Sequence, residues 1–199
     1  KVLSSISGGT ITSAMYAHQL AKGKKFKGCF DKLYKLLNED KLVSRALYKL
    51  NHPSTWENRS KTKDLINAFS EVYNEDFYDS ANFGSIDLKK LHLDDVTFGA
   101  VELSTGIKFR FIESEEQPRF GNRFVNLSTE TYPDIKIADA VASSSCFPGG
   151  FEPMIMPRDF SDGPDSAIAK YWNDKKKTNP LYEPTALMDG GAIDNQGIQ

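Results

Sequence analysis

The spacing of apolar residues changes along the chain, and each change predicts a different element. Residues 2–6 form a short apolar run typical of a buried strand, and the small-residue segment 10–22 that follows predicts a helix ending at Gly23. Between residues 24 and 75, apolar side chains recur every three or four positions, which predicts a series of amphipathic helices. The first of these helices has a lysine-rich side, which we expect either to be solvated or to approach anionic lipid.

Strand character returns in the second half of the chain. Residues 96–103 and 108–113 are strand-like, and Ser104-Thr105-Gly106 between them predicts a hairpin turn. An alanine-rich helix is expected over residues 137–144, and the polar residues 154–184 predict a loop insertion with one short helix. Patterning alone therefore predicts a mixed α/β fold.

The length of the chain indicates the number of domains, and its net charge limits the classes of partner that it can bind. The chain has 199 residues, of which 39% are hydrophobic and 26% are charged, as in an ordinary globular domain. We predict a single domain over residues 1–199, with the helical excursion 24–75 and the loop insertion 154–184. The net charge of -2 leaves no excess of positive charge for phosphates, so we expect no nucleic-acid partner. No apolar run approaches the roughly 18 residues of a membrane span, so no transmembrane segment is predicted.

The cysteines and histidines point to no metal site. Cys29 and Cys146 lie far apart in the sequence and are compatible with two free thiols or with one disulfide. His18, His52 and His92 lack the spacing of metal ligands, so each is expected to be a core or solvated side chain.

Ser7 stands where the first apolar run passes into the first helix, directly before Gly8 and Gly9. Glycine beside a serine lowers the steric cost of a sharp strand-to-helix turn that exposes the hydroxyl group. The free amides and the positive end of the helix would stabilise an oxyanion there. Ser7 is therefore a candidate nucleophile, with the Gly8 and Gly9 amides as oxyanion donors, although such clusters also form ordinary turns or phosphate-contacting loops.

A similar turn lies near the other end of the chain. The apolar run 186–188 leads to Asp189, and Gly190 and Gly191 follow, so the carboxylate can be held on a tight turn. An exposed aspartate is a weak base because its usual pKa is about 3.9. Asp189 can assist Ser7 only if it is desolvated and within hydrogen-bond reach of the hydroxyl group.

Several motifs follow one another in the order of a known family. They are Ser4-Ser5-Ile6-Ser7-Gly8-Gly9-Thr10, Glu102-Leu103-Ser104-Thr105-Gly106, Ala138-Asp139-Ala140-Val141-Ala142-Ser143-Ser144-Ser145 with Phe147-Pro148, and Asp189-Gly190-Gly191 with Asp194-Asn195. This ordered set resembles the patatin-like phospholipase family, especially the branch similar to cytosolic phospholipase A2.

The resemblance implies a fold, an activity and a substrate class. The fold is expected to be a three-layer α/β/α sandwich with a mostly parallel central sheet. The implied activity is that of a serine lipid acyl hydrolase, which cleaves acyl esters of phospholipids or related lipids through a Ser7/Asp189 dyad and an acyl-enzyme. No metal or organic cofactor is expected, and the implied partners are a lipid substrate and the surface of a membrane.

Two departures from the family pattern bear on activity. Ser5 stands where the usual motif has its first glycine, and the glycine-rich loop that supplies most of the family's oxyanion hole would precede Lys1. We therefore expect the chain to be a fragment of an enzyme that lacks the N-terminal part of the fold, and whose activity depends on that loop.

Two other functions stay open at this point. The domain could bind lipid or regulate a partner without turnover, or Cys146 could act as the nucleophile of a cysteine hydrolase with a histidine. Head-group preference, localisation and oligomeric state are not encoded in these motifs.

Overall fold

The computed structural model describes residues 1–38, 41–56, 60–132 and 134–193, so the Asp194-Asn195 pair lies outside the described residues. Its strands are β1 (Val2–Ile6), β2 (Asp95–Glu102), β3 (Ile107–Ser114), β4 (Arg119–Gly121), β5 (Asn126–Leu127), β6 (Met154–Met156) and β7 (Thr185–Asp189). Its α-helices are α1 (Gly9–Ala21), α2 (Phe26–Asn38), α3 (Leu42–Asn51), α4 (Leu65–Asp76), α5 (Leu88–Leu91), α6 (Ile137–Ser144) and α7 (Ala167–Thr178). Short 3₁₀ turns lie at Pro53–Thr55, Phe83–Ser85, Arg158–Phe160 and Gly190–Ala192.

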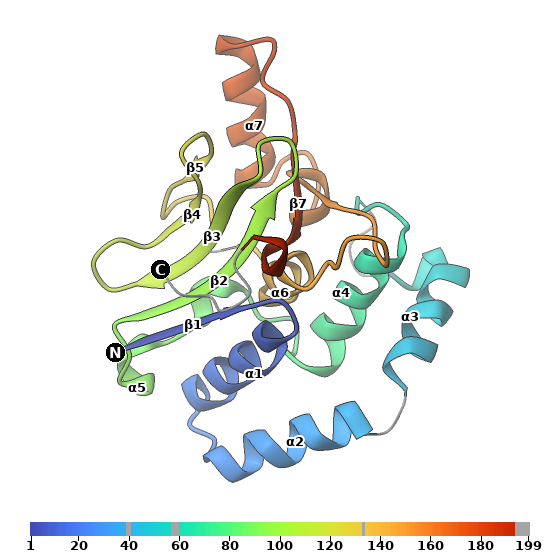
Figure 1. The fold of residues 1–199 in the computed structure, drawn as a ribbon, viewed down its shortest axis with the longest axis vertical. Helices are drawn as coiled ribbons and strands as arrows, with labels where there is room; N and C mark the ends of the chain where they lie inside the picture. Colours follow the sequence, from blue (N-terminus) through green and yellow to red (C-terminus); the bar gives the residue numbers. More distant parts are fainter. Residues whose placement is uncertain (39–40, 57–59, 133, 194–199) are drawn as a thin grey trace.

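The strands form one curled sheet that is mostly antiparallel, so the expected mostly parallel sheet is wrong. The order is β5-β4-β3-β2-β7-β6, and β1 also pairs with β2 (Figure 1). Among the described strands, only β1 and β2 run parallel to each other. Parallel neighbours need a long crossover connection. The helical segment between β1 and β2 is such a crossover, whereas short turns join β2, β3, β4 and β5 and make them antiparallel.

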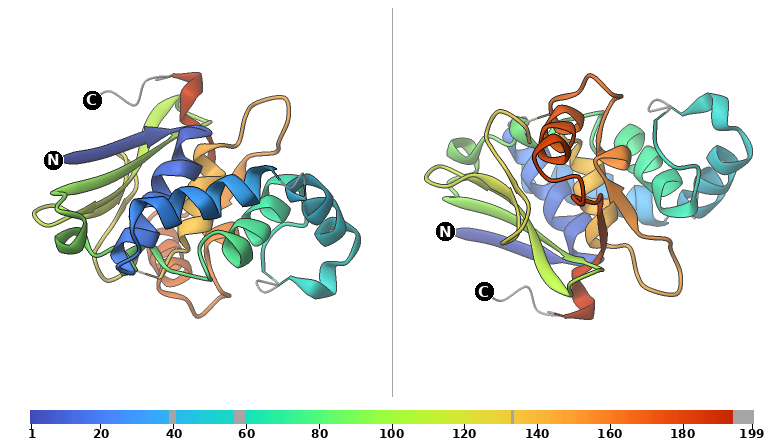
Figure 2. Two further views of the ribbon diagram at one scale, coloured as in Figure 1. Left: turned by 90° about the horizontal axis from the view of Figure 1, so that it is seen from below. Right: turned by 90° about the horizontal axis from the view of Figure 1, so that it is seen from above.

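The helices that contact the sheet lie on one of its faces. Helix α1 packs against β1, and α6 packs against β2 and β7, on the same side of the sheet (Figure 2). On β3, Phe109 and Phe111 point into this layer and are fully buried, whereas Lys108, Arg110 and Ile112 on the opposite face are partly exposed. In the described part of the chain, the expected three-layer sandwich is thus replaced by a sheet with one helical layer.

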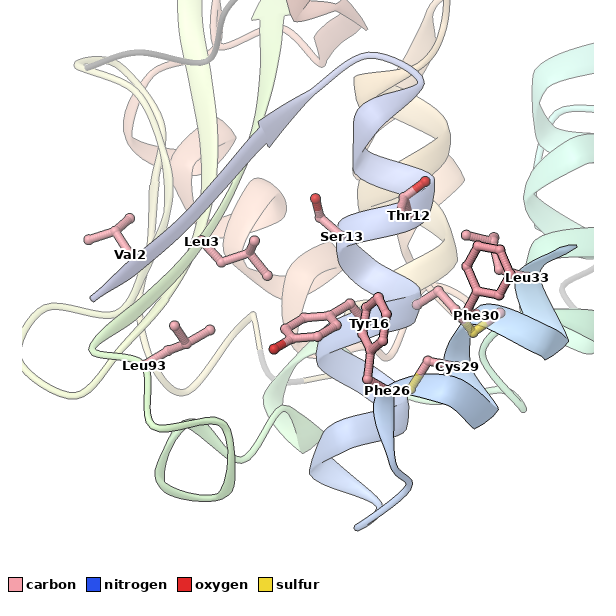
Figure 3. A pocket seen from close by; sticks show the side chains of 11 residues that line it. Val2, Leu3, Thr12, Ser13, Tyr16, Phe26, Cys29, Phe30, Leu33 and Leu93 are labelled. Carbon is pink, nitrogen blue, oxygen red and sulfur yellow. The ribbon is translucent and has the colours of Figure 1, made fainter.

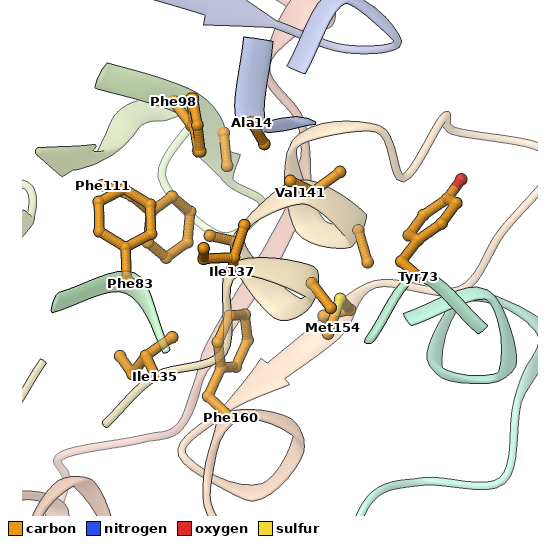
Figure 4. Packing of buried hydrophobic residues seen from close by; sticks show 14 of the residues in the cluster. Ala14, Tyr73, Phe83, Phe98, Phe111, Ile135, Ile137, Val141, Met154 and Phe160 are labelled. Atoms are coloured by element: carbon orange, nitrogen blue, oxygen red, sulfur yellow. The ribbon is translucent and has the colours of Figure 1, made fainter. Parts of the chain in front are cut away.

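The hydrophobic core fills the space between the sheet and α6. Every residue of α6 is buried, which explains why its sequence is almost free of charged side chains. Aromatic rings from the sheet and from neighbouring loops surround it (Figure 4). The Phe83 ring lies 5.3 Å from the Phe98 ring and 4.6 Å from the Phe120 ring, both in edge-to-face geometry, which aromatic pairs favour.

Several local predictions agree with these elements. The bounds of α6 coincide with the predicted helix 137–144, and β2 and β3 form the predicted hairpin. The segment 24–75 contains α2, α3 and α4, while 154–184 contains strand β6 and the 12-residue helix α7 as well as loops. The division of the chain into one domain with two insertions stays a prediction.

A buried ion cluster fixes α6 to α4. The Lys61 ammonium group pairs with the Asp139 carboxylate of α6, lies 3.7 Å from Glu71 Oε1 of α4, and donates a hydrogen bond to Ser70 Oγ at 3.0 Å. Ser70 Oγ also donates to Asp139 Oδ1 at 2.5 Å. The side chains of Lys61, Glu71 and Asp139 are each 2% exposed. Because water cannot solvate the buried Asp139 carboxylate, the Lys61 ammonium group is needed as its counter-charge.

We predict that Lys61→Met destabilises the protein, because it leaves the Asp139 carboxylate buried without its counter-charge. The free energy of unfolding should fall by about 3–5 kcal/mol in urea denaturation at neutral pH. Lys27→Met is the matched control, since Lys27 pairs with Asp31 on the exposed surface of α2 and such pairs contribute about 1 kcal/mol or less. Equal and small effects of the two substitutions would contradict the structural role of the cluster.

Candidate active site

Ser7 and Asp189 meet because β1 and β7 share one edge of β2. Strand β1 runs parallel to β2 and ends with Ile6 opposite Gly99, while β7 runs antiparallel and ends with Asp189 opposite Ala100. The two strands therefore approach each other head to head along the same edge. Two residues that lie 182 positions apart in sequence are brought to adjacent positions by this pairing.

The two side chains are joined by a short hydrogen bond. Ser7 Oγ donates to Asp189 Oδ2 at 2.6 Å, and the other carboxylate oxygen, Oδ1, accepts a hydrogen bond from the Gly191 amide at 2.7 Å. Asp189 is 3% exposed, and Ser7 is partly exposed. The carboxylate is thus desolvated, oriented through one oxygen and directed at the serine through the other.

The unusual backbone angle of this turn lies at Ser7 itself. Its φ is 56°, in the left-handed region that non-glycine residues rarely adopt, whereas the φ of Gly8 is −54°. A Cβ atom on Gly8 or Gly9 would meet nothing within 4 Å. The strained position of the turn is therefore Ser7, and the expectation that the two glycines relieve this strain is not met; open space surrounds both glycine positions.

The amides of Gly8 and Gly9 are available to a ligand. In the first turn of α1, the Thr10 amide donates to Ser7 O at 2.9 Å and the Ile11 amide to Gly8 O at 3.2 Å. Neither glycine amide has a hydrogen-bond partner within the described ranges. Free amides at a helix N-terminus, where the helix dipole is positive, are suited to an anionic oxygen.

Gly190 has a different role from Gly8 and Gly9. A Cβ atom on Gly190 would lie 2.5 Å from Ile6 Cδ1 and 2.8 Å from Gly99 O. The turn after Asp189 can therefore approach β1 and β2 only without a side chain at this position. Gly191 supports the acid through its amide, as described above.

Sequence patterns did not identify two further groups at the site. Ser7 N donates to the Ser144 hydroxyl at 3.2 Å, and the Asp189 amide donates to the carbonyl oxygen of Cys146 at 3.0 Å. Ser144 is the last residue of α6, and Cys146 follows it by two positions, directly before Phe147-Pro148. A serine run at a helix end indicates polar contacts there, but nothing in it distinguishes Ser144 from its neighbours.

The thiols and imidazoles take no part in this geometry. Cys29 and Cys146 are both free and buried. Burial raises the pKa of the Cys146 thiol to about 12, and its Sγ donates to the Glu152 carbonyl at 2.8 Å, so a reactive thiolate is disfavoured. His18 lies beside Asp79, and burial lowers its pKa; His52 stacks on Tyr48.

An apolar groove of about 470 Å³ runs between β1, α1 and α2 (Figure 3). Leu3, Tyr16, Phe26 and Phe30 line its length, and Thr12 and Ser13 from the early turns of α1 also border it. Phe26 and Phe30 are 65% and 55% exposed, which is unusual for large aromatic side chains. The groove therefore offers apolar surface on the same helix that begins beside Ser7.

Two further features concern the described residues as a whole. No His, Cys, Asp and Glu side chains among them gather in a group that could hold a metal ion. None of the described helices combines the length and the apolar character that crossing a membrane requires.

We predict that Gly190→Ala destabilises the protein, because the new methyl group would overlap Ile6 and the Gly99 carbonyl group. Overpacking of this kind costs about 1–3 kcal/mol and should lower the melting temperature in a thermal scan. Gly28→Ala in α2 is the control, since a Cβ there meets nothing within 4 Å and alanine favours the helix. A melting temperature of Gly190→Ala equal to that of the wild type would show that the turn is not tightly packed.

Comparison with known proteins places the chain in a family. No curated protein and no solved structure matches the chain. The family model described as patatin-like phospholipase matches residues 1–199, the full length of the sequence. This family suggests a lipid acyl hydrolase with a lipid substrate, while the narrower likeness to the cytosolic phospholipase A2 branch stays a prediction. The chain belongs to the patatin-like phospholipase family.

Proposed function

We propose that the protein hydrolyses acyl esters of phospholipids or related lipids, with Ser7 as the nucleophile and Asp189 as the general base. The observation that carries this proposal is the 2.6 Å hydrogen bond from Ser7 Oγ to Asp189 Oδ2. A candidate base must lie within hydrogen-bond reach of the proton that it removes. The hydrogen bond from the Gly191 amide to Asp189 Oδ1 supports the same role, because it orients the carboxylate and leaves Oδ2 facing the serine.

Acylation follows from this arrangement. As Ser7 Oγ attacks the carbonyl carbon of the ester, its proton passes to Asp189 Oδ2 and a tetrahedral oxyanion forms. When the ester C–O bond breaks, Asp189 returns the proton to the departing alcohol oxygen. The acyl group is left on Ser7.

Deacylation reverses the roles of the same groups. Asp189 takes a proton from a water molecule, whose oxygen attacks the acyl carbon. The second tetrahedral intermediate collapses, the proton goes back to Ser7 Oγ, and the fatty acid is released.

The oxyanion requires donors that are in place before the reaction. The free amides of Gly8 and Gly9 supply them in our proposal, together with the positive end of α1. The apolar groove between β1, α1 and α2 supports a lipid substrate, because an acyl chain is stabilised by removing apolar surface from water.

Removal of the nucleophile tests the proposal against a lipid-binding module without turnover. We predict that Ser7→Ala lowers the hydrolysis of short-chain acyl esters by on the order of 10³-fold or more and abolishes labelling by a fluorophosphonate probe. Ser85→Ala, at an exposed serine whose hydroxyl donates to Asn82 O, should retain both. Absence of labelling in the wild-type protein would favour the binding module instead.

Removal of the base tests the role of the carboxylate separately. Asp189→Asn keeps the size of the side chain but cannot accept the proton of Ser7 Oγ. We expect kcat to fall by about 10²–10⁴-fold, with KM changed much less, in steady-state assays with the same esters. If Asp189→Asn turns over at the wild-type rate, another group must be the base.

A further inference from the structure

The hydroxyl group of Ser144 lies at the centre of a buried hydrogen-bond network. Ser144 is the last residue of α6 and is fully buried. Its Oγ lies 3.2 Å from Ser7 N, 2.8 Å from Thr10 Oγ1 and 2.6 Å from the Gly99 carbonyl oxygen. These three partners belong to the Ser7 turn, to α1 and to β2, so one hydroxyl group joins three separate elements.

The direction of each hydrogen bond follows from the chemistry of the groups. A carbonyl oxygen can only accept, so Ser144 must give its single proton to Gly99 O. The Ser7 amide and the Thr10 hydroxyl must then donate to the two acceptor positions of Ser144 Oγ. The hydrogen-bonding capacity of Ser144 is thereby fully used, with no position left for water.

The Ser7 turn needs such a support. With φ at 56°, Ser7 holds a backbone conformation that is unfavourable for a residue with a side chain, and such conformations persist only where surrounding contacts maintain them. The Ser7 amide belongs neither to the ladder of β1 nor to the hydrogen bonds of α1, and Ser144 Oγ is its acceptor.

The same end of α6 also holds the acid. The Cys146 carbonyl oxygen, two residues after Ser144, accepts the hydrogen bond of the Asp189 amide at 3.0 Å. Residues 144–146 therefore contact both candidate catalytic residues: Ser144 accepts a hydrogen bond from Ser7, and Cys146 accepts one from Asp189. Because α6 is itself fixed by the Lys61 and Asp139 ion pair, this span is anchored in the core.

We infer that Ser144 is a positioning residue, which holds the Ser7 turn against β2 and thereby sets the distance between Ser7 Oγ and Asp189 Oδ2. It touches no reacting atom, and its effect on catalysis rests on the function proposed above. Loss of the hydroxyl group frees the Ser7 amide and lets the turn relax, so that the serine loses its alignment with the carboxylate.

Ser144→Ala is the variant that tests this role, with Ser143→Ala as its matched control. Ser143 is equally buried on the same helix, but its hydroxyl donates only to Ala140 O at 3.0 Å within α6. We expect Ser144→Ala to lower kcat by about 10- to 100-fold with KM within about twofold, while Ser143→Ala leaves kcat unchanged.

Hydrogen–deuterium exchange of the Ser7 amide, followed by NMR, supplies a readout that does not depend on turnover. Exchange should become faster in Ser144→Ala and stay at the wild-type rate in Ser143→Ala. Thr10→Val, which keeps the side-chain shape and removes one hydrogen bond to Ser144, should have a smaller effect on both kcat and exchange. If Ser144→Ala does not fold, Thr10→Val is compared with Ser143→Ala in its place.

The outcomes separate the two proposals. If Ser144→Ala and Ser143→Ala change the exchange of the Ser7 amide equally, or if exchange increases without any loss of kcat, Ser144 is not a positioning residue. If exchange changes as expected but the wild-type protein has no esterase activity, the proposed hydrolase function fails and the support of the Ser7 turn by Ser144 stands.

Discussion

The shared edge of β2 is the constraint on which the rest of the site depends. One half of this edge pairs with β1 and the other half with β7, and the two strands end at neighbouring positions. The meeting point tolerates little volume, because Ile6 occupies the space into which a side chain on Gly190 would project. The contact between Ser7 and Asp189 is thus a property of strand pairing, which a local motif alone cannot create.

Helix α6 fixes the geometry of the site at the point where β1 and β7 end. It is buried along its whole length, it is fixed to α4 through the Lys61 and Asp139 pair, and its end supplies hydrogen bonds to both sides of the site. Buried polar groups are costly unless they are satisfied. Two groups of satisfied buried polar side chains lie where α6 meets Lys61 and where it meets the Ser7 turn, so these polar contacts also support the site.

Part of this arrangement could be predicted from the sequence, because it is local. The helix over residues 137–144, the hairpin around Gly106 and the two glycine turns all depend on neighbouring residues, and the structure contains each of them. The mostly parallel sheet, which the family resemblance implied, is wrong because short turns make β2, β3, β4 and β5 antiparallel. The direction of β7 depends on a distant partner, since its three-residue overlap with β2 leaves no periodic signal. The acceptor role of Ser144 and the left-handed angle at Ser7 were missed for the same reason. Helix α7 continues to Thr178, beyond the short helix expected there; the Ser166 side chain caps its start, and Trp172 is buried.

The proposed hydrolase function requires that the Ser7 hydroxyl becomes acylated during turnover. The most direct measurement is a rapid acid quench of the protein during turnover of an activated acyl ester, followed by peptide mapping in a mass spectrometer. The peptide that contains Ser7 is expected to be heavier by the mass of one acyl group. Turnover with the acyl group on another residue, such as Cys146, would contradict this expectation.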